Sequence, residues 1–506
     1  MFRILGVCSV VKRFFGCVLT GSAVVLLAAG PAAAAVGPLS QVSGLSPFTP
    51  GCNGAPQTGS VFVNSEVEPW ADVNPTDAGN QVGIWQQDRW SNGGANGLLT
   101  AYSADGGGTW VTPSLAEQPH FSRCGGGTAA NGGDFERATD PWVSFGPNGD
   151  AYAMSLSIND SNFDHALLVS KSTDGGKTWG PNVTLLRENN PHVFNDKNSL
   201  TADYTDANNA YGVWDRLVFP NERSRGDASA FRTRAFRGPV AFTRTTNGGT
   251  SWEPVRLIYD PGQNDQTIGN QIAVMPDGDL VDVFNEIHND NKHKRRGFTV
   301  TLLRSTSQGQ TWSGPITVSR LGTVGVTDPR DGAPVRTGDI LPEVASDERP
   351  NTDNLYLVWQ DARFTGGQRD QIAFSRSTDG GVTWSTPVRV SANANTQAFT
   401  PSVDVADDGT IAVTYYDFSA DTVASPTLDT QYWVTKSTDG GLTWSPREEI
   451  TDGPFDMRSA PFAGGFFTGD YEGLESAGTT FIPFVSFANT GNAANPTDIF
   501  AARVTP

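Results

Sequence analysis

Two groups of side chains in this chain could transfer protons or attack a substrate. In the run GDYEG, Tyr471 stands between Asp470 and Glu472. A tyrosine activated by a neighbouring carboxylate can act as a nucleophile, and a second carboxyl group can donate or accept a proton. In the run NEIH, Glu286 and His288 could form an acid and base pair, or they could belong to a polar rim. Asp470, Tyr471 and Glu472 are the first candidates, Glu136-Arg137 with Asp140 the second, and Glu286 with His288 the third.

Four arginines could hold an anionic ligand. A guanidinium binds a carboxylate through two parallel hydrogen bonds. Three of the four follow Trp and Asp in the segments WQQDRW, WDR and WQDAR, and the fourth lies in DFERATDPW. The candidates are Arg89, Arg137, Arg216 and Arg363. Because the Trp and Asp pattern recurs, an internal ion pair that locks each repeat is the favoured interpretation for Asp88, Asp215 and Asp361.

A repeated framework must position these side chains. Six copies of one eight-residue motif start 60 to 73 residues apart, which is the length of four strands and their loops. They are SADGGGTW from Ser103, STDGGKTW from Ser172, TTNGGTSW from Thr245, STSQGQTW from Ser305, STDGGVTW from Ser377 and STDGGLTW from Ser437. Units of this size must stack to bury a core, and a radial β-propeller is the natural arrangement.

Strand-like runs surround each motif and predict one unit more than the motifs do. In each repeat, two strands joined by a Gly- and Asp-rich turn come first, and a third strand leads into the eight-residue motif, here called the box. A short fourth strand follows the box. The runs after the last box supply three further strands without a fourth. Residues Ser60 to Ser65 are predicted to complete that unit beside Asp498 to Val504. The fold class is therefore all-β, a seven-bladed propeller closed by pairing of the two chain ends, which leaves no open edge.

The box S-x-D-G-G-x-T-W resembles the Asp-box, or bacterial neuraminidase repeat, of the sialidase superfamily. The resemblance implies a propeller in which the box residues are structural: Asp and Ser or Thr bond the turn, Gly permits positive φ, and Trp anchors neighbouring blades. It also implies that a ligand would lie at the opposite channel mouth, where loops enter the first strand or leave the second. All the candidates above lie in such loops.

The N-terminal residues predict export. Arg3, Lys12 and Arg13 precede an apolar run and the segment PAAAA, so residues 1–35 are predicted to be a cleaved signal peptide of a secreted protein. Residues 36–56 form an extended lead-in, and residues 57–506 form the propeller. Two cysteines, Cys52 and Cys124, remain in the mature chain, and a disulfide is the simplest state of such a pair after export.

Charge limits the partners. The net charge of −19, or −22 without the leader cations, argues against nucleic acid and anionic membranes. We expect a monomer with a glycan or polysaccharide partner. No nucleotide or zinc motif occurs, so no cofactor is required. Calcium could bind an acidic loop, although the sequence gives no specific ligand set.

Three functions remain open. The resemblance favours a sialidase-like glycoside hydrolase acting on an exposed acidic glycan. The second is a polysaccharide lyase that uses Tyr or His as a base beside an Arg-bound uronate. The third is a non-catalytic propeller that binds glycan or protein. Sialidases usually have six blades and an early Arg-Ile-Pro segment, whereas the only Arg-Ile here is Arg3-Ile4 in the leader. An enzyme would need two proton-transfer groups about 5 to 10 Å apart.

Overall fold

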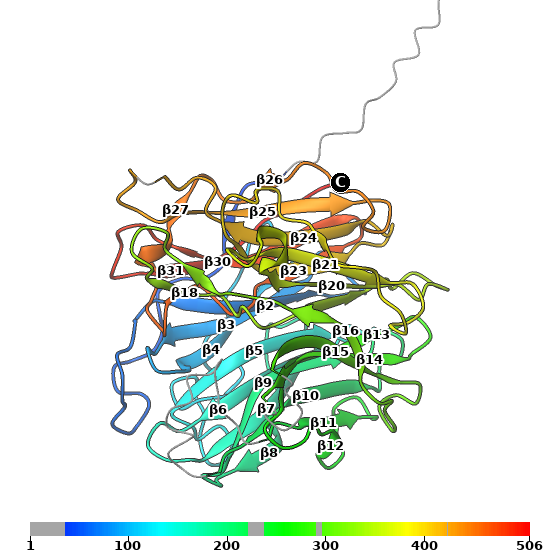
Figure 1. The fold of residues 1–506 in the computed structure, drawn as a ribbon. Coiled ribbons are helices and arrows are strands. Elements are labelled where there is room, and N and C mark those ends of the chain that lie inside the picture. The colour runs from blue at the N-terminus through cyan, green and yellow to red at the C-terminus, as the bar shows by residue number, and fades with distance from the viewer. Residues whose placement is uncertain (1–35, 221–236, 290–295, 423) are drawn as a thin grey trace, which may run out of the picture.

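A computed structural model describes residues 36–220, 237–289, 296–422 and 424–506. The predicted signal peptide lies outside these residues. The described part of the chain is all-β, with two short 3-10 helices, η1 (Ala362–Thr365) and η2 (Met457–Ser459), and antiparallel sheets (Figure 1). In this part no helix is long and apolar enough to cross a bilayer.

Consecutive strands build units of similar design. The first contains β2 (Glu66–Val73), β3 (Gln81–Arg89) and β4 (Ala95–Ser103), and the second contains β5 (Arg137–Phe145), β6 (Ala151–Ile158), β7 (His165–Ser172) and β8 (Val183–Glu188). The third contains β9 (Val193–Ala202), β10 (Ala210–Val218), β11 (Val240–Thr245) and β12 (Arg256–Tyr259). The fourth contains β13 (Gln266–Val274), β14 (Leu280–His288), β15 (Gly297–Ser305) and β16 (Ile316–Leu321).

The remaining units follow the same order. The fifth contains β19 (Glu343–Ser346), β20 (Leu355–Asp361), β21 (Gln371–Ser377) and β22 (Val388–Arg389), and the sixth contains β23 (Ala398–Val405), β24 (Ile411–Asp417), β25 (Asp429–Ser437) and β26 (Glu448–Glu449). The last contains β29 (Gly473–Ala477), β30 (Thr480–Ala488), β31 (Thr497–Ala501) and β1 (Ser40–Gln41).

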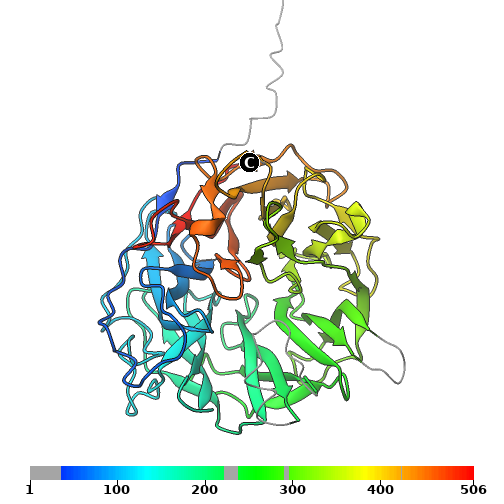
Figure 2. The same ribbon diagram turned by 60° about the vertical axis from the view of Figure 1, so that its left-hand side comes forward.

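The first strands of the units surround a common centre (Figure 2). Each contacts the first strand of the next unit, in the order β2, β5, β9, β13, β19, β23 and β29, and β29 contacts β2. Apolar side chains fill the spaces between neighbouring units. One such cluster joins Val82 and Leu98 of the first unit to Val143 and Leu168 of the second.

The box residues have local roles in their turns. In the first box, Asp105 accepts hydrogen bonds from the backbone and hydroxyl of Thr109, both at 2.8 Å, and Ser103 accepts one from the Gly107 N–H at 2.9 Å. The tryptophan that ends the second box, Trp179, is 9% exposed and donates to Thr100 of the first unit. The box therefore connects a turn to the neighbouring unit.

The strand that completes the last unit differs from the one predicted. Ser40 and Gln41 of β1 pair with Ala501 and Phe500, and Val42 beside them is 6% exposed. The prediction for Ser60 to Ser65 was wrong, because the backbone of that segment already bonds to the residues at the end of β3. It touches β31 only at an isolated bridge between Ser65 and Thr497.

Long segments cover the end of the centre at which the first strands begin. There β17 (Val326–Thr327), β18 (Pro334–Arg336) and β28 (Phe466–Phe467) form a small sheet, and β27 (Phe455–Asp456) pairs with β25. The cover bonds to the first strands, because Thr468 O accepts from the Glu68 N–H and Thr337 O accepts from the Thr400 hydroxyl.

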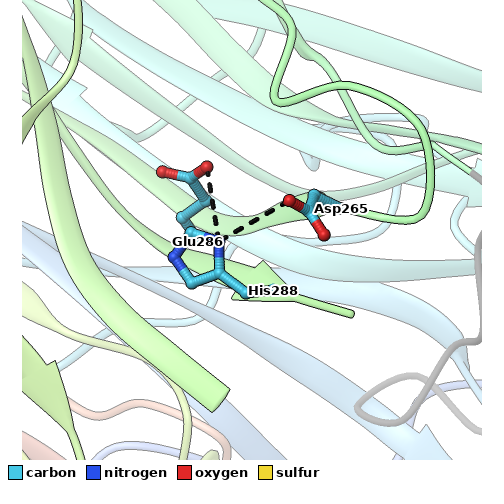
Figure 3. Close-up of side chains that lie close together, drawn as sticks. All are labelled: Asp265, Glu286 and His288. Atoms are coloured by element: carbon cyan, nitrogen blue, oxygen red, sulfur yellow. Dashed lines mark ion pairs between the residues drawn. The ribbon is translucent and has the colours of Figure 1, made fainter. Parts of the chain in front are cut away.

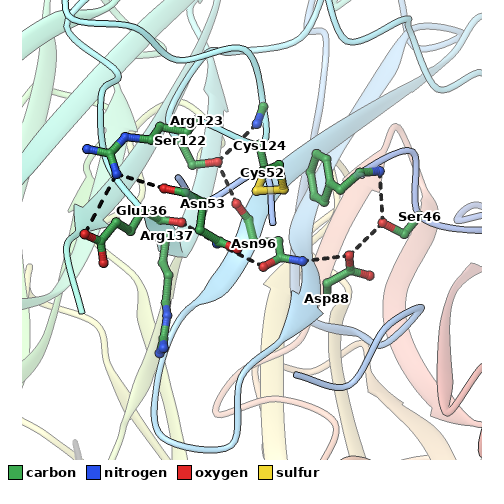
Figure 4. Close-up of a disulfide and its surroundings, with 12 residues drawn as sticks. Ser46, Cys52, Asn53, Asp88, Asn96, Ser122, Arg123, Cys124, Glu136 and Arg137 are labelled. Atoms are coloured by element: carbon green, nitrogen blue, oxygen red, sulfur yellow. Dashed lines mark hydrogen bonds and ion pairs between the residues drawn. A yellow bond between two sulfur atoms is a disulfide. The ribbon is translucent and has the colours of Figure 1, made fainter. Parts of the chain in front are cut away.

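The disulfide between Cys52 and Cys124 confirms the predicted pairing. It joins the N-terminal segment to the loop between β4 and β5 (Figure 4). Asn53 beside it donates to the carbonyl of Glu136 at 2.7 Å, and Arg123 donates to the carbonyl of Asn53 at 2.8 Å. The crosslink and its hydrogen bonds hold this loop against the second unit.

Candidate functional site

Asp470, Tyr471 and Glu472 precede β29 and have separate environments. Asp470 forms ion pairs with Lys197 at 2.9 Å and with Arg336 at 2.5 Å. Burial alone would raise the pKa of Asp470, but Arg336 and Lys197 outweigh burial and hold it well below its ordinary value. This carboxylate is therefore a fixed anion within the protein.

Tyr471 and Glu472 are also enclosed. The Tyr471 ring packs against Trp142 and Trp70, with centroids 5.6 and 6.1 Å away, and its hydroxyl lies 3.4 Å from the Pro141 carbonyl oxygen. Burial raises the pKa of this hydroxyl well above its ordinary value, which opposes formation of the phenolate. Glu472 is 0% exposed and accepts hydrogen bonds from the Tyr416 hydroxyl and the Ser486 N–H.

A buried charge cluster lies beside these residues. Lys197 contacts Glu68 at 3.2 Å, Asp140 at 3.3 Å and Asp470 at 2.9 Å, and every partner side chain is at most 3% exposed. Lys197 lies on β9, Asp140 on β5 and Arg336 on β18, and Asp470 lies just before β29. The structure thus brings together four segments that the sequence indicates as polar. These charged side chains form ion pairs with one another.

The four candidate arginines are engaged by nearby groups. Arg137 is 1% exposed, contacts Asp160 at 3.2 Å and lies over the Trp90 ring, and burial lowers its pKa to about 10. The others also have polar partners: Gln86 accepts from Arg89, Glu188 pairs with Arg216, and Asp361 pairs with Arg363. The four lie on different units, on β3, β5, β10 and η1.

The predicted locking ion pair occurs at one of its three positions in the described residues. Asp361 pairs with Arg363 at 2.7 Å. Asp88 instead accepts hydrogen bonds from Ser46, Asn64 and Asn96, and Asp215 accepts one from Asn270.

Glu286 and His288 form a cluster with a third residue that the sequence does not indicate. Asp265 directly precedes β13, and antiparallel pairing of Gln266 with Ile287 brings it beside the end of β14. The His288 Nδ1 lies 3.6 Å from Asp265 and 3.7 Å from Glu286 (Figure 3). The ligand atoms of this triad all lie within 4.8 Å of one another.

The triad is more accessible than the residues beside β29. Its side chains retain 10 to 14% exposure. The Tyr259 hydroxyl donates to Glu286 Oε1 at 3.1 Å, and His288 Nε2 lies 2.9 Å from the Thr299 hydroxyl. Two carboxyl groups beside an imidazole can exchange protons with a substrate, and the same donor set suits a divalent metal ion.

A cavity of about 650 Å³ occupies the centre at the end where the first strands finish. The stacked rings of Trp70 and Trp142, 3.7 Å apart, form part of its wall. Its acidic lining residues are Asp72, Glu343, Glu348, Asp404, Asp407 and Glu475. This end is opposite to the mouth that the resemblance favours. The segments WADV and SVDV carry aspartate at the same position, which is a sequence signal for these carboxylates.

No family model matches the chain, and none of the curated proteins matches it. Among solved structures it is similar to the Hadza microbial sialidase Hz136 with a TM-score of 0.45 and 16% identity, covering 73% of this chain and 66% of that one. This chain thus spans slightly less than two thirds of that sialidase.

Two further solved structures are similar at comparable levels. An α-L-arabinanase of Penicillium chrysogenum, complexed with arabinobiose, has a TM-score of 0.45 and 12% identity, with 92% of this chain and 98% of that one covered. A PL25 ulvan lyase has a TM-score of 0.43 and 11% identity, with 82% of each chain covered.

Proposed function

We propose that this protein is a secreted glycan-cleaving enzyme, a sialidase-like glycoside hydrolase on a seven-bladed propeller. The six box motifs and the cyclic contacts of the first strands support the propeller. The observation that carries the catalytic proposal is the accessible triad of Asp265, Glu286 and His288. Retaining glycoside hydrolases commonly use two carboxyl groups about 5 to 5.5 Å apart, and one oxygen of Asp265 and one of Glu286 lie within 4.8 Å of each other, close to the lower end of that range.

In this proposal Glu286 transfers the proton to or from the glycosidic oxygen. Asp265 supplies the second carboxylate, and the His288 imidazole lies beside both, 3.6 Å from Asp265 and 3.7 Å from Glu286. Tyr259 orients Glu286 through its hydrogen bond. These roles replace Tyr471 and Glu472 as the leading assignment, because Glu472 is 0% exposed and the Tyr471 ring is packed against two tryptophans, whereas the triad side chains keep 10 to 14% exposure.

An acidic substrate fits the surroundings of the triad. Glu286 pairs across the sheet with Thr299, and Thr299 pairs with Arg320, so their side chains share one face. Arg363, predicted to bind substrate, contacts the backbone of Arg320 and is 31% exposed. The Arg320 guanidinium is therefore the one we expect to hold a carboxylate on the glycan, since the Arg363 guanidinium is already paired with Asp361.

A lyase is the second candidate, favoured by one specific observation. Tyr259 and His288 both lie beside Glu286. A hydroxyl and an imidazole near a bound uronate could remove the proton next to its carboxylate and protonate the leaving oxygen.

A screen of sialosides, uronate polymers and neutral glycans tests the proposal. Hydrolysis releases reducing ends only, whereas elimination also produces an ultraviolet-absorbing unsaturated sugar. Glu286→Gln should lower kcat by at least ~10²-fold without changing the melting temperature. Glu448→Gln, on outer strand β26, is the matched control and should retain activity.

The same screen tests the alternative assignments. If Glu286→Gln keeps full turnover while Tyr471→Phe and Glu472→Gln lose it, catalysis belongs to the residues beside β29. Binding of a glycan without turnover, by the wild type and all variants, would identify a non-catalytic propeller.

A further inference from the structure

The triad of Asp265, Glu286 and His288 has the spacing of a metal site. Among the described residues it is the one group in which at least three His, Cys, Asp or Glu side chains place their ligand atoms within 4.8 Å of one another. The His288 Nδ1 lies 3.6 Å from Asp265 Oδ2 and 3.7 Å from Glu286 Oε1. Two ligands of one zinc ion lie about 3 to 4 Å apart, so these separations need only small adjustments.

Paired strands hold the three ligands in place. Glu286 and His288 are two residues apart on β14, so their side chains project from the same face of the sheet. Asp265 is fixed by the Asn289 N–H, which donates to its Oδ1 at 2.7 Å and leaves Oδ2 as the oxygen that faces the imidazole. Figure 3 shows the three side chains directed toward one another.

The other nitrogen of the imidazole indicates which tautomer is present. His288 Nε2 lies 2.9 Å from the Thr299 hydroxyl, and this hydroxyl donates to the Glu286 carbonyl at 3.5 Å. The hydroxyl therefore accepts from Nε2, which carries the proton, and Nδ1 presents a lone pair to the two carboxylates. A histidine that binds a metal ordinarily donates its other ring N–H to a neighbouring acceptor in this way.

The His288 Nδ1 also lacks the contact that a metal would supply. This atom is buried and has no hydrogen-bond partner among the described residues. Its separations of 3.6 and 3.7 Å from the carboxylate oxygens are too long for a proton to bridge, whereas a metal ion fits between atoms at this spacing. A buried lone pair that faces two other acceptors is costly unless a cation lies between them.

We propose that Asp265, Glu286 and His288 bind a zinc-class divalent ion. The nitrogen ligand favours zinc over calcium and magnesium, which prefer oxygen ligands. Three protein ligands leave a fourth position for water, which can reach the ion because the side chains are 10 to 14% exposed. The Tyr259 hydroxyl donates to Glu286 Oε1 at 3.1 Å and orients this carboxylate from outside the site.

The bound ion and proton transfer by the same triad exclude each other. An ion held by Glu286 occupies the carboxylate that would exchange a proton with the glycosidic oxygen. Zinc should therefore inhibit glycan cleavage, and EDTA should restore it. This effect on turnover rests on the proposed function, whereas binding of the ion does not.

Isothermal titration of the full chain with zinc chloride, after treatment with EDTA and removal of the chelator, tests the proposal. At neutral pH the wild type should show one site, at least ~10²-fold tighter for zinc than for calcium or magnesium. His288→Gln should weaken zinc binding by at least ~10²-fold, and Tyr259→Phe by about 10-fold, because it removes an outer partner of the ligand Glu286. His192→Gln, at an exposed histidine directly before β9, is the matched control and should bind zinc as the wild type does.

Asp265→Asn keeps the test decisive if His288→Gln does not fold. The asparagine oxygen can still accept from the Asn289 N–H, while the charge toward the ion is lost. The proposal is overturned if the wild type binds no zinc, if the ligand variants that fold bind it as tightly as the wild type, or if His192→Gln abolishes binding. Zinc that binds at this site without slowing glycan cleavage would instead overturn the catalytic role of Glu286 and leave the metal site standing.

Discussion

Lys197 contacts three carboxyl groups inside the protein, of which Asp470 stays ionised and Glu68 keeps its proton to about pH 8. Removing such a hub would leave buried anions without a partner, which commonly costs about 3 to 5 kcal/mol. The Glu286 side chain, by contrast, retains partial exposure beside His288. At the scale of single residues, the charges around Lys197 are enclosed more completely than those of the proposed catalytic triad.

Glu68 provides a pH-dependent test of the buried cluster. Burial raises its pKa from 4.5 to about 8, although Lys197 opposes the shift. The folded protein therefore keeps a proton that the unfolded chain has already lost, so this group makes stability fall as pH rises from about 4.5 to about 8. Glu68→Gln resembles the protonated form and should reduce that fall.

The measurement is the midpoint of urea unfolding at several pH values. Glu68→Gln should show a smaller loss of stability between pH 5 and pH 8 than the wild type, and Glu448→Gln should follow the wild type. Parallel curves for Glu68→Gln and the wild type would contradict the assigned pKa shift.

At the scale of elements, residues 36–65, which precede β2, are attached to the rest of the protein at two places. The start of this segment contributes β1 to the last unit, and Cys52, near its middle, is bonded to Cys124. The intervening residues also contact the structure, because the Ser46 hydroxyl donates to Asp88 at 2.7 Å. The segment is therefore part of the fold and spans the junction between the last and first units.

Loss of the disulfide should destabilise the protein substantially. The two cysteines are 72 residues apart. Closing a loop of that length lowers the entropy of the unfolded chain, which raises the free energy of unfolding by about 4 kcal/mol. The double variant Cys52→Ser, Cys124→Ser should unfold at a lower urea concentration by a corresponding amount. The reduced wild type is the control and should match it. Equal midpoints for the double variant and the oxidised wild type would refute this expectation.

Local patterns allowed much of the framework to be predicted. The box turns form from hydrogen bonds within four residues, as in Asp105 with Thr109, so the sequence contains all the information they need. The partner of β31 could not be identified in this way. The sequence pointed to Ser60 to Ser65 and indicated only an extended lead-in around Ser40. The outcome depends on the backbone groups at the end of β3, which already bond Ser60 to Ser65.

Only the part of the candidate site that depends on local geometry could be predicted from the sequence. Glu286 and His288 are two residues apart on one strand, so their proximity follows from strand geometry. Asp265 joins them only through pairing of β13 with β14. The burial of Tyr471 and Glu472 depends on packing against residues distant in sequence, such as Trp70 and Tyr416, which no local pattern reveals.

At the scale of the whole molecule, the cyclic order of first strands makes the last unit dependent on both chain ends. Without β1 the outer edge of β31 would expose its backbone groups, and an open edge invites pairing with other chains. The apolar side chain of Val42 adds to the junction, because it packs with Phe484 and Ile499.

Removal of residues 36–43 should therefore weaken the whole fold. In a chain that begins at residue 44, the free energy of unfolding should fall by at least about 2 kcal/mol, which is the contribution of one buried valine. This chain should also aggregate more readily, because the edge of β31 is exposed. Thermal unfolding and light scattering measure the two effects, with a chain that begins at residue 36 as the control. Unchanged stability and solubility in the shorter chain would show that β1 is dispensable.

Pairing of Ser40 with Ala501 also sets the order of events during synthesis. The first described strand leaves the ribosome roughly 20 to 90 s before its partner, at translation rates of about 5 to 20 residues per second. During that interval the earlier units can fold while the ring remains open. The last unit is completed only after β31 has emerged and paired with β1.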